Sequence, residues 1–118
     1  MNMHRMTMIV FAAIWIAVAS SQAACFNNGQ DLVNGWREHQ KIMNNSPAER
    51  DYLSASRFTG YVTGVADALD TIMFDIPEGT TKDQIVAIVG KYLEANPDKW
   101  QFGRSVLVVN ALKGAFPK

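Results

Sequence analysis

The sequence predicts an all-α protein, a compact four-helix domain that follows a cleaved N-terminal signal peptide. Three observations support this prediction. Apolar residues recur every three or four positions over four stretches of the chain, as they do on the buried side of a helix. Capping residues, prolines and glycines separate these stretches. We find no convincing alternation of polar and apolar residues of the kind that is typical of a strand.

The N-terminus has the pattern of a secretory signal peptide. Met1–Thr7 carries one arginine and no acidic residue, Met8–Ala19 is an uninterrupted apolar run, and Ser20–Ala24 is small and polar. The apolar run is shorter than the roughly 20 residues that a membrane span needs. Ser21 and Ala23 fit the small-x-small rule of signal peptidase sites, so we expect cleavage after Ala23 and a mature domain over residues 24–118.

Two alternatives to this cleavage are an uncleaved anchor helix and lipid attachment at Cys25. Cys25 is the only cysteine, so an internal disulfide is excluded, and we expect either a spectator or an intermolecular link. The full chain carries eleven basic and eleven acidic residues. A chain so close to neutral is not built to bind nucleic acid or an anionic membrane by charge alone.

The first helix is predicted over Asp31–Met43. Leu32, Trp36, His39 and Met43 occur there at helical spacing. A turn should follow directly, because asparagine, serine and proline are clustered after this segment. We expect Trp36 to lie in the core.

The second helix is predicted from about Pro47 to Met73. Ser46 would cap it, Pro47 suits its first position, and Glu49 stands three residues after the cap, as a capping box requires. Its apolar stripe consists of Tyr52, Ala55, Phe58, Val62, Val65, Leu69 and Ile72. We expect this stripe, Tyr52 included, to face the core.

Gly60 and Gly64 lie four residues apart on one face of the same helix. Each glycine costs roughly 1 kcal/mol of helix stability relative to alanine. We predict that they allow a neighbouring helix to approach closely; backbone contact with a ligand is the alternative. Asp67 and Asp70 form a carboxylate pair that is usually solvated, and we expect Asp67 to cap or hydrogen-bond the turn near Gly79.

The third helix is predicted after the Pro-Glu-Gly turn. Thr81 would be its N-cap, with Gln84 completing a capping box. Asn96 and Pro97 would stop the helix. Its buried face is predicted to consist of Ile85, Ile88, Val89, Tyr92 and Leu93.

The fourth helix is predicted over Arg104–Ala115. Val106–Val109, Ala111 and Leu112 make it apolar on nearly every side. We therefore expect a central position or an interface, such as dimerisation through this helix.

The loop before this helix is our candidate partner-binding site. Its residues Asp98, Lys99, Trp100, Phe102 and Arg104 combine aromatic and cationic side chains, and tryptophan and arginine dominate interface hot spots. The alternative is that both aromatic side chains fold back onto the core.

The sequence offers no catalytic, cofactor-binding or metal-binding set. After export His39 would be the only histidine, so a hydrolase with a Ser–His–Asp or Cys–His site would depend on it alone. His39 also has no nearby cysteine or histidine with which to share a metal. The glycines match neither a phosphate loop nor a dinucleotide fingerprint. We therefore expect no enzyme activity and no cofactor.

Four segments in series, GYVTGVADAL, IPEGTT, KYLEANP and ALKGAFP, resemble the Rap1a/Tai family of type VI secretion immunity proteins. The resemblance runs from about Gly29 to the end. It implies a small periplasmic helical protein, often dimeric, that binds a peptidoglycan amidase effector and blocks its active site without performing chemistry. The alternative is a general periplasmic helical binding or chaperone-like protein with no toxin partner.

One departure from the family pattern concerns two cysteines. The family pattern has one before the IPEG-like turn and one after the terminal AFP, where this sequence has Asp75 and Lys118. A disulfide there would contribute about 2–4 kcal/mol, whereas an exposed Asp75–Lys118 ion pair would contribute about 0–1 kcal/mol. We therefore predict a looser C-terminus than in relatives with the cysteines, which hydrogen exchange at Phe116 would test.

Overall fold

The computed structural model describes residues 28–118, so the predicted signal peptide and Cys25 lie outside the described residues. It contains four α-helices, α2 (Gly29–Met43), α3 (Tyr52–Leu69), α4 (Lys82–Ala95) and α5 (Arg104–Ala115), and a short 3-10 helix, η1 (Pro97–Lys99), before α5. Within these residues there is no strand, only two isolated bridges. The predicted all-α, four-helix domain is confirmed.

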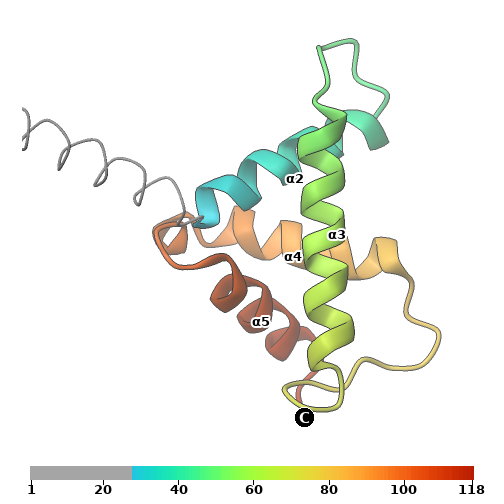
Figure 1. The fold of residues 1–118 in the computed structure, drawn as a ribbon, viewed down its shortest axis with the longest axis vertical. Coiled ribbons are helices and arrows are strands. Elements are labelled where there is room, and N and C mark those ends of the chain that lie inside the picture. Colours follow the sequence, from blue (N-terminus) through green and yellow to red (C-terminus); the bar gives the residue numbers. More distant parts are fainter. Residues whose placement is uncertain (1–27) are drawn as a thin grey trace, which may run out of the picture.

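Helix α3 is the long element around which the others gather. In Figure 1, α2 lies beside its first half, α5 approaches its second half and α4 crosses behind it. All four helices contribute to one core of buried apolar side chains: Leu32, Val33, Trp36, Ala55, Phe58, Val62, Ala66, Phe74, Val86, Val89, Leu93, Leu107, Val108, Ala111 and Leu112. In the part of the chain that the structure describes, no helix is both long enough and apolar enough to span a membrane.

Local capping signals set the starts of α2 and α4. α2 begins two residues earlier than predicted, because the side chain of Asn28 accepts a hydrogen bond from Gln30 N at 3.0 Å. The predicted capping box of α4 is confirmed: Gln84 N donates to Thr81 Oγ1 at 3.2 Å, and Thr81 N donates to Gln84 Oε1 at 2.8 Å. α4 stops before Asn96, and α5 has the predicted bounds.

The predicted start of the second helix is wrong. α3 begins five residues later, at Tyr52, because Asp51 is its N-cap and accepts a hydrogen bond from Ser54 N at 3.0 Å. Ser46, the expected cap, instead accepts from Ala48 N at 3.2 Å within the preceding turn. As a result, the side chain of Tyr52 is 58% exposed and lies outside the core, whereas Trp36 is buried as predicted.

The predicted end of this helix is also wrong. α3 stops at Leu69, and Thr71 adopts a left-handed backbone with φ of 69°. The turn exposes 63% of Ile72 and places Phe74 in the core with none of its surface exposed. Phe74 therefore fills the position that the apolar stripe assigned to Ile72.

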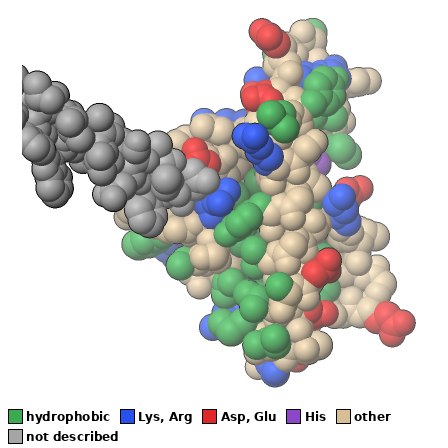
Figure 2. Space-filling model, viewed as in Figure 1, with side chains coloured by type: hydrophobic (Ala, Val, Ile, Leu, Met, Phe, Trp, Pro, Cys, Tyr) green, Lys and Arg blue, Asp and Glu red, His purple; other side chains and the backbone are tan. Residues whose placement is uncertain are grey.

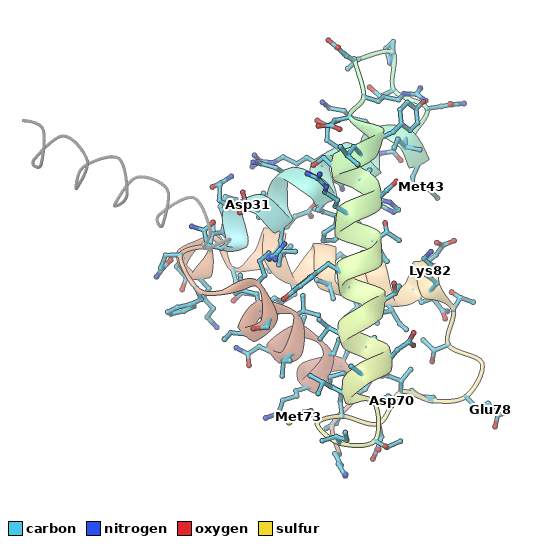
Figure 3. The ribbon with its side chains drawn as sticks, viewed as in Figure 1. Asp31, Met43, Asp70, Met73, Glu78 and Lys82 are labelled. Carbon is cyan, nitrogen blue, oxygen red and sulfur yellow. The ribbon has the colours of Figure 1, made fainter. Side chains whose placement is uncertain are left out.

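Asp70 holds the turn that directly follows α3. Its Oδ1 accepts hydrogen bonds from Thr71 N at 3.0 Å and from Ile76 N at 2.9 Å. Asp67, which we expected to cap or hydrogen-bond the turn near Gly79, is exposed on α3. The reason is geometric, because only the residue at the helix end can reach the amides of the turn that follows it. Figure 3 labels Asp70 and Met73 at this end of the molecule.

The predicted role of Gly60 and Gly64 is wrong as well. Nothing lies within 4 Å of the position that a Cβ would occupy at either glycine, because both face away from the buried side of α3. Close approach occurs elsewhere. A Cβ on Gly35 would lie 2.6 Å from Phe58 Cβ, and a Cβ on Gly90 would overlap the indole ring of Trp36. These glycines bring α2 against α3 and α4.

Hydrogen bonds, and not the expected ion pair, attach the C-terminus to the turn that follows α3. Asp75 N donates to Phe116 O at 3.1 Å, and Lys118 Nζ donates to Thr71 O. Within residues 28–118 the one ion pair joins Lys41 and Glu38, so Asp75 and Lys118 do not form the expected pair. The looser C-terminus stays a prediction.

Candidate partner-binding surface

The loop predicted to bind a partner folds largely against its own chain. Trp100 is half-buried, and its Nε1 donates to Leu93 O at 2.8 Å. Arg37 covers the same indole, with Cζ 5.7 Å from the ring centroid. Phe102 stays 47% exposed. Trp100 therefore follows the alternative of folding back, while Phe102 remains on the surface.

The charged residues of this loop point to two different helices. Lys99 Nζ lies 5.9 Å from the ring centroid of Tyr92 on α4, while Arg104 Cζ lies 4.4 Å from the ring centroid of Tyr61 on α3. Asp98 is exposed. The five predicted residues thus do not point to one neighbour, and their part in partner binding stays a prediction.

Arg104 leads to a cleft that sequence reasoning missed. The cleft has a volume of about 300 Å³ and lies where α2, α3 and α5 meet. It is lined by Asp31, Leu32, Asn34, Asp51, Ser54, Arg57, Phe58, Tyr61 and Arg104. Because these residues come from three helices, the only local signal in the sequence was the four-residue spacing of Arg57 and Tyr61 on one helix face.

An apolar groove continues from this cleft along α3. It is lined by Gly60, Tyr61, Gly64, Val65, Ala68, Leu69 and Ser105, so Tyr61 belongs to both hollows. Val106, the next residue after Ser105, is a large apolar side chain left exposed. Figure 2 shows hydrophobic side chains gathered between α3 and α5 on this face, with Lys and Arg side chains toward α2. Gly60 and Gly64 therefore line an open groove on the surface of α3.

The model of the family described as Rap1a immunity proteins matches residues 28–117. The chain belongs to this family. The match covers all four helices, which are the elements that build the core. No curated protein and no solved structure matches the chain. The Rap1a proteins are type VI immunity proteins, whose role is to bind a cognate effector.

The Rap1a domain also exposes apolar side chains at the junction of α2 and α3. Met43, Tyr52 and Leu53 are all largely exposed there. The connection between α2 and α3 lies at the top of Figure 1. Figure 3 labels Met43 at the end of α2. This end is a second surface on which a partner protein could pack.

His39 has a structural position in the Rap1a domain. Its ring is half-buried and stacks on Trp36 with 5.6 Å between ring centroids and 22° between ring planes. Trp36 Nε1 in turn donates to Glu94 Oε1 at 2.7 Å. Among residues 28–118, no group of three or more His, Cys, Asp or Glu side chains could hold a metal ion.

Glu38 connects α2 to the start of α3. Its Oε1 accepts a hydrogen bond from Lys41 Nζ at 2.8 Å, and its Oε2 accepts one from Asp51 N at 2.9 Å. These two hydrogen bonds hold the pKa of Glu38 below the ordinary 4.5 of a glutamate, and the bond from Lys41 has the larger effect. Because the folded pKa is lowered, the ionised carboxylate stabilises the fold above pH 4.5, and this contribution is lost as the pH falls through the folded pKa.

Replacing Glu38 by glutamine is expected to lower the melting temperature at pH 7. The difference from the wild type should shrink below pH 4.5 and disappear once the wild-type carboxylate is protonated. Glu49→Gln is the matched control, because Glu49 contributes its backbone oxygen to Lys41 Nζ, at 3.3 Å. Thermal unfolding of the three proteins from pH 7 to pH 3 measures the effect. A Glu38→Gln difference that stays constant over this range would contradict the assignment.

Proposed function

We propose that the protein is a periplasmic immunity protein that binds a type VI secreted peptidoglycan amidase and covers its active site. The observation that carries this proposal is the family match, which spans residues 28–117 and so every helix. The amidase target is supported by the resemblance of the four sequence segments. The periplasmic location is supported by the signal-peptide pattern of residues 1–23.

Inhibition by covering an active site needs a shaped surface and no chemistry of the inhibitor's own. The domain offers such surfaces in the cleft at Arg57 and Arg104 and in the apolar groove along α3. Aromatic and arginine side chains are the residue types that anchor tight protein interfaces. Tyr61 and Arg104, stacked at 4.4 Å, are of this kind. We therefore propose that the protein acts by binding alone and is not an enzyme.

The proposal includes a homodimer. The last helix was the expected contact, but Leu107, Val108, Ala111 and Leu112 are buried within their own chain. Val106 is a large apolar side chain of this helix that is exposed, so a second copy can contact it. The mass of the purified chain in solution, measured by light scattering, tests this part of the proposal.

A mixing experiment with a purified candidate type VI amidase tests the main proposal. The purified mature protein is expected to inhibit peptidoglycan hydrolysis fully near one chain per amidase. Lysozyme, which cleaves the glycan strands of the same peptidoglycan, is the control and should stay active. Full amidase activity at saturating protein would reject the proposal. Broad binding to unfolded client proteins, with no single tight partner, would favour the chaperone-like alternative.

A further inference from the structure

We infer that the cleft between α2, α3 and α5 holds a carboxylate side chain of the bound effector, with Arg57 and Arg104 as its ligands. This inference rests on the proposed immunity function and gives that function a contact site. Arginine's planar fork binds carboxylates through two parallel hydrogen bonds, which makes it well suited to this role. Both arginines line the cleft, one from α3 and the other from the first turn of α5.

Neither arginine forms an ion pair within the part of the chain that the structure describes. Within residues 28–118 the one ion pair is Lys41–Glu38, so no carboxylate lies within 4.0 Å of either guanidinium group. The two acids of the cleft lie at helix starts: Asp51 is the N-cap of α3 and Asp31 lies in the first turn of α2. Carboxylates at these positions are stabilised by the helix ends.

Arg104 is already positioned for binding. Its guanidinium group lies over the Tyr61 ring, with Cζ 4.4 Å from the centroid. Arg57 is on the same helix as Tyr61, four residues earlier and so one turn away on the same face. A side chain held in place loses less conformational freedom when it binds, so more of the interaction appears as affinity.

The surroundings of the cleft favour a protein segment over a free anion. Its lining carries two arginines and two aspartates, so it has no net positive charge that would concentrate a small anion. The groove that shares Tyr61 is lined mainly by apolar side chains and by Gly60 and Gly64. An occupant must therefore present a carboxylate together with a neighbouring apolar side chain. Packing of that apolar side chain would exclude water and strengthen the ion pairs beside it.

A second copy of this chain is the competing occupant. Asp67 lies as far beyond the centre of the Gly60–Gly64 pair as Arg57 lies before it, so an antiparallel copy of α3 could bring its Asp67 to Arg57. In this antiparallel arrangement, the Asp67 that pairs with Arg57 leaves Arg104 without a carboxylate from the second copy. The dependence on Arg104 therefore separates the two occupants.

Inhibition, by charge-reversed variants, of the amidase that the wild type inhibits tests the inference. Arg57→Glu and Arg104→Glu are each expected to weaken inhibition at least about tenfold, and the double variant at least about 100-fold. Arg57→Lys and Arg104→Lys should lose less, because they keep the charge but not the fork. Lys91→Glu is the matched control and should inhibit like the wild type, because Lys91 is exposed on α4 and lines neither hollow. Circular dichroism checks that each variant is folded.

Three results would overturn the inference. If the wild type inhibits and the double variant inhibits equally well, the cleft is not the contact and the proposed function stands. If the wild type inhibits no amidase, the proposed function fails and the inference with it. The third result concerns the mass in solution of the protein without amidase. If Arg57→Glu lowers this mass and adding Asp67→Arg to the same chain restores it, a second copy occupies the site.

Discussion

Replacing Phe74 by alanine is expected to destabilise the protein by about 3–5 kcal/mol, the usual cost of removing a buried phenylalanine. None of the Phe74 surface is exposed, and it is among the largest fully buried side chains of the core. The turn around it is already fixed, because Thr71 N donates to Phe74 O at 2.8 Å and Asp70 accepts from Ile76 N. The backbone therefore cannot easily collapse into the cavity that alanine would leave.

Urea unfolding followed by circular dichroism measures this effect. Ile72→Ala is the matched control two residues away, since Ile72 is 63% exposed and its truncation should change the free energy of unfolding by no more than about 0.5 kcal/mol. A loss below about 1 kcal/mol in Phe74→Ala would show that this turn contributes little to the core. Equal losses in the two variants would contradict the assignment of Phe74, rather than Ile72, as the anchor.

The sequence predicted those helices whose ends are marked by local chemistry. Thr81 and Gln84 satisfy each other's backbone amides, and this reciprocal pair can be recognised from spacing alone. The same reasoning misplaced the start of α3, because Ser46 and Asp51 are both good N-caps and only packing decides between them. Phe74 was missed for a related reason. It lies outside the helical period, and a turn with a left-handed Thr71 brings it into the core.

The candidate binding surface was predictable only in part. Of the five residues proposed at the start of the last helix and in the loop before it, Arg104 lines the cleft. The sequence could not show that Arg57 and Tyr61 line the same cleft as Arg104, because their proximity to Arg104 depends on how α3 packs against α5. Trp100 was offered as a contact residue, yet its indole N–H is used within the chain by Leu93 O.

The four glycines at positions 35, 60, 64 and 90 show the same limit, because spacing does not reveal which glycine faces a neighbour. Replacing Gly90 by alanine is expected to destabilise the protein by about 1–3 kcal/mol. The added Cβ would overlap the indole ring of Trp36. That ring cannot move away freely, because its Nε1 donates to Glu94 Oε1 at 2.7 Å and its face stacks on His39.

The same substitution at Gly60 should act in the opposite direction and stabilise the protein by about 0.5–1 kcal/mol. Nothing lies within 4 Å of the Cβ that would be added there, so alanine brings its better helix propensity without a clash. Thermal and urea unfolding of the two variants compare the signs directly, with each protein differing from the wild type by one methyl group. A stabilising Gly90→Ala would contradict the close contact of Gly90 with the Trp36 ring. A destabilising Gly60→Ala would mean that α3 packs with Gly60 inward and that the groove beside Tyr61 is closed. Opposite signs would place Gly90 at the contact of α4 with α2 and leave Gly60 on the surface.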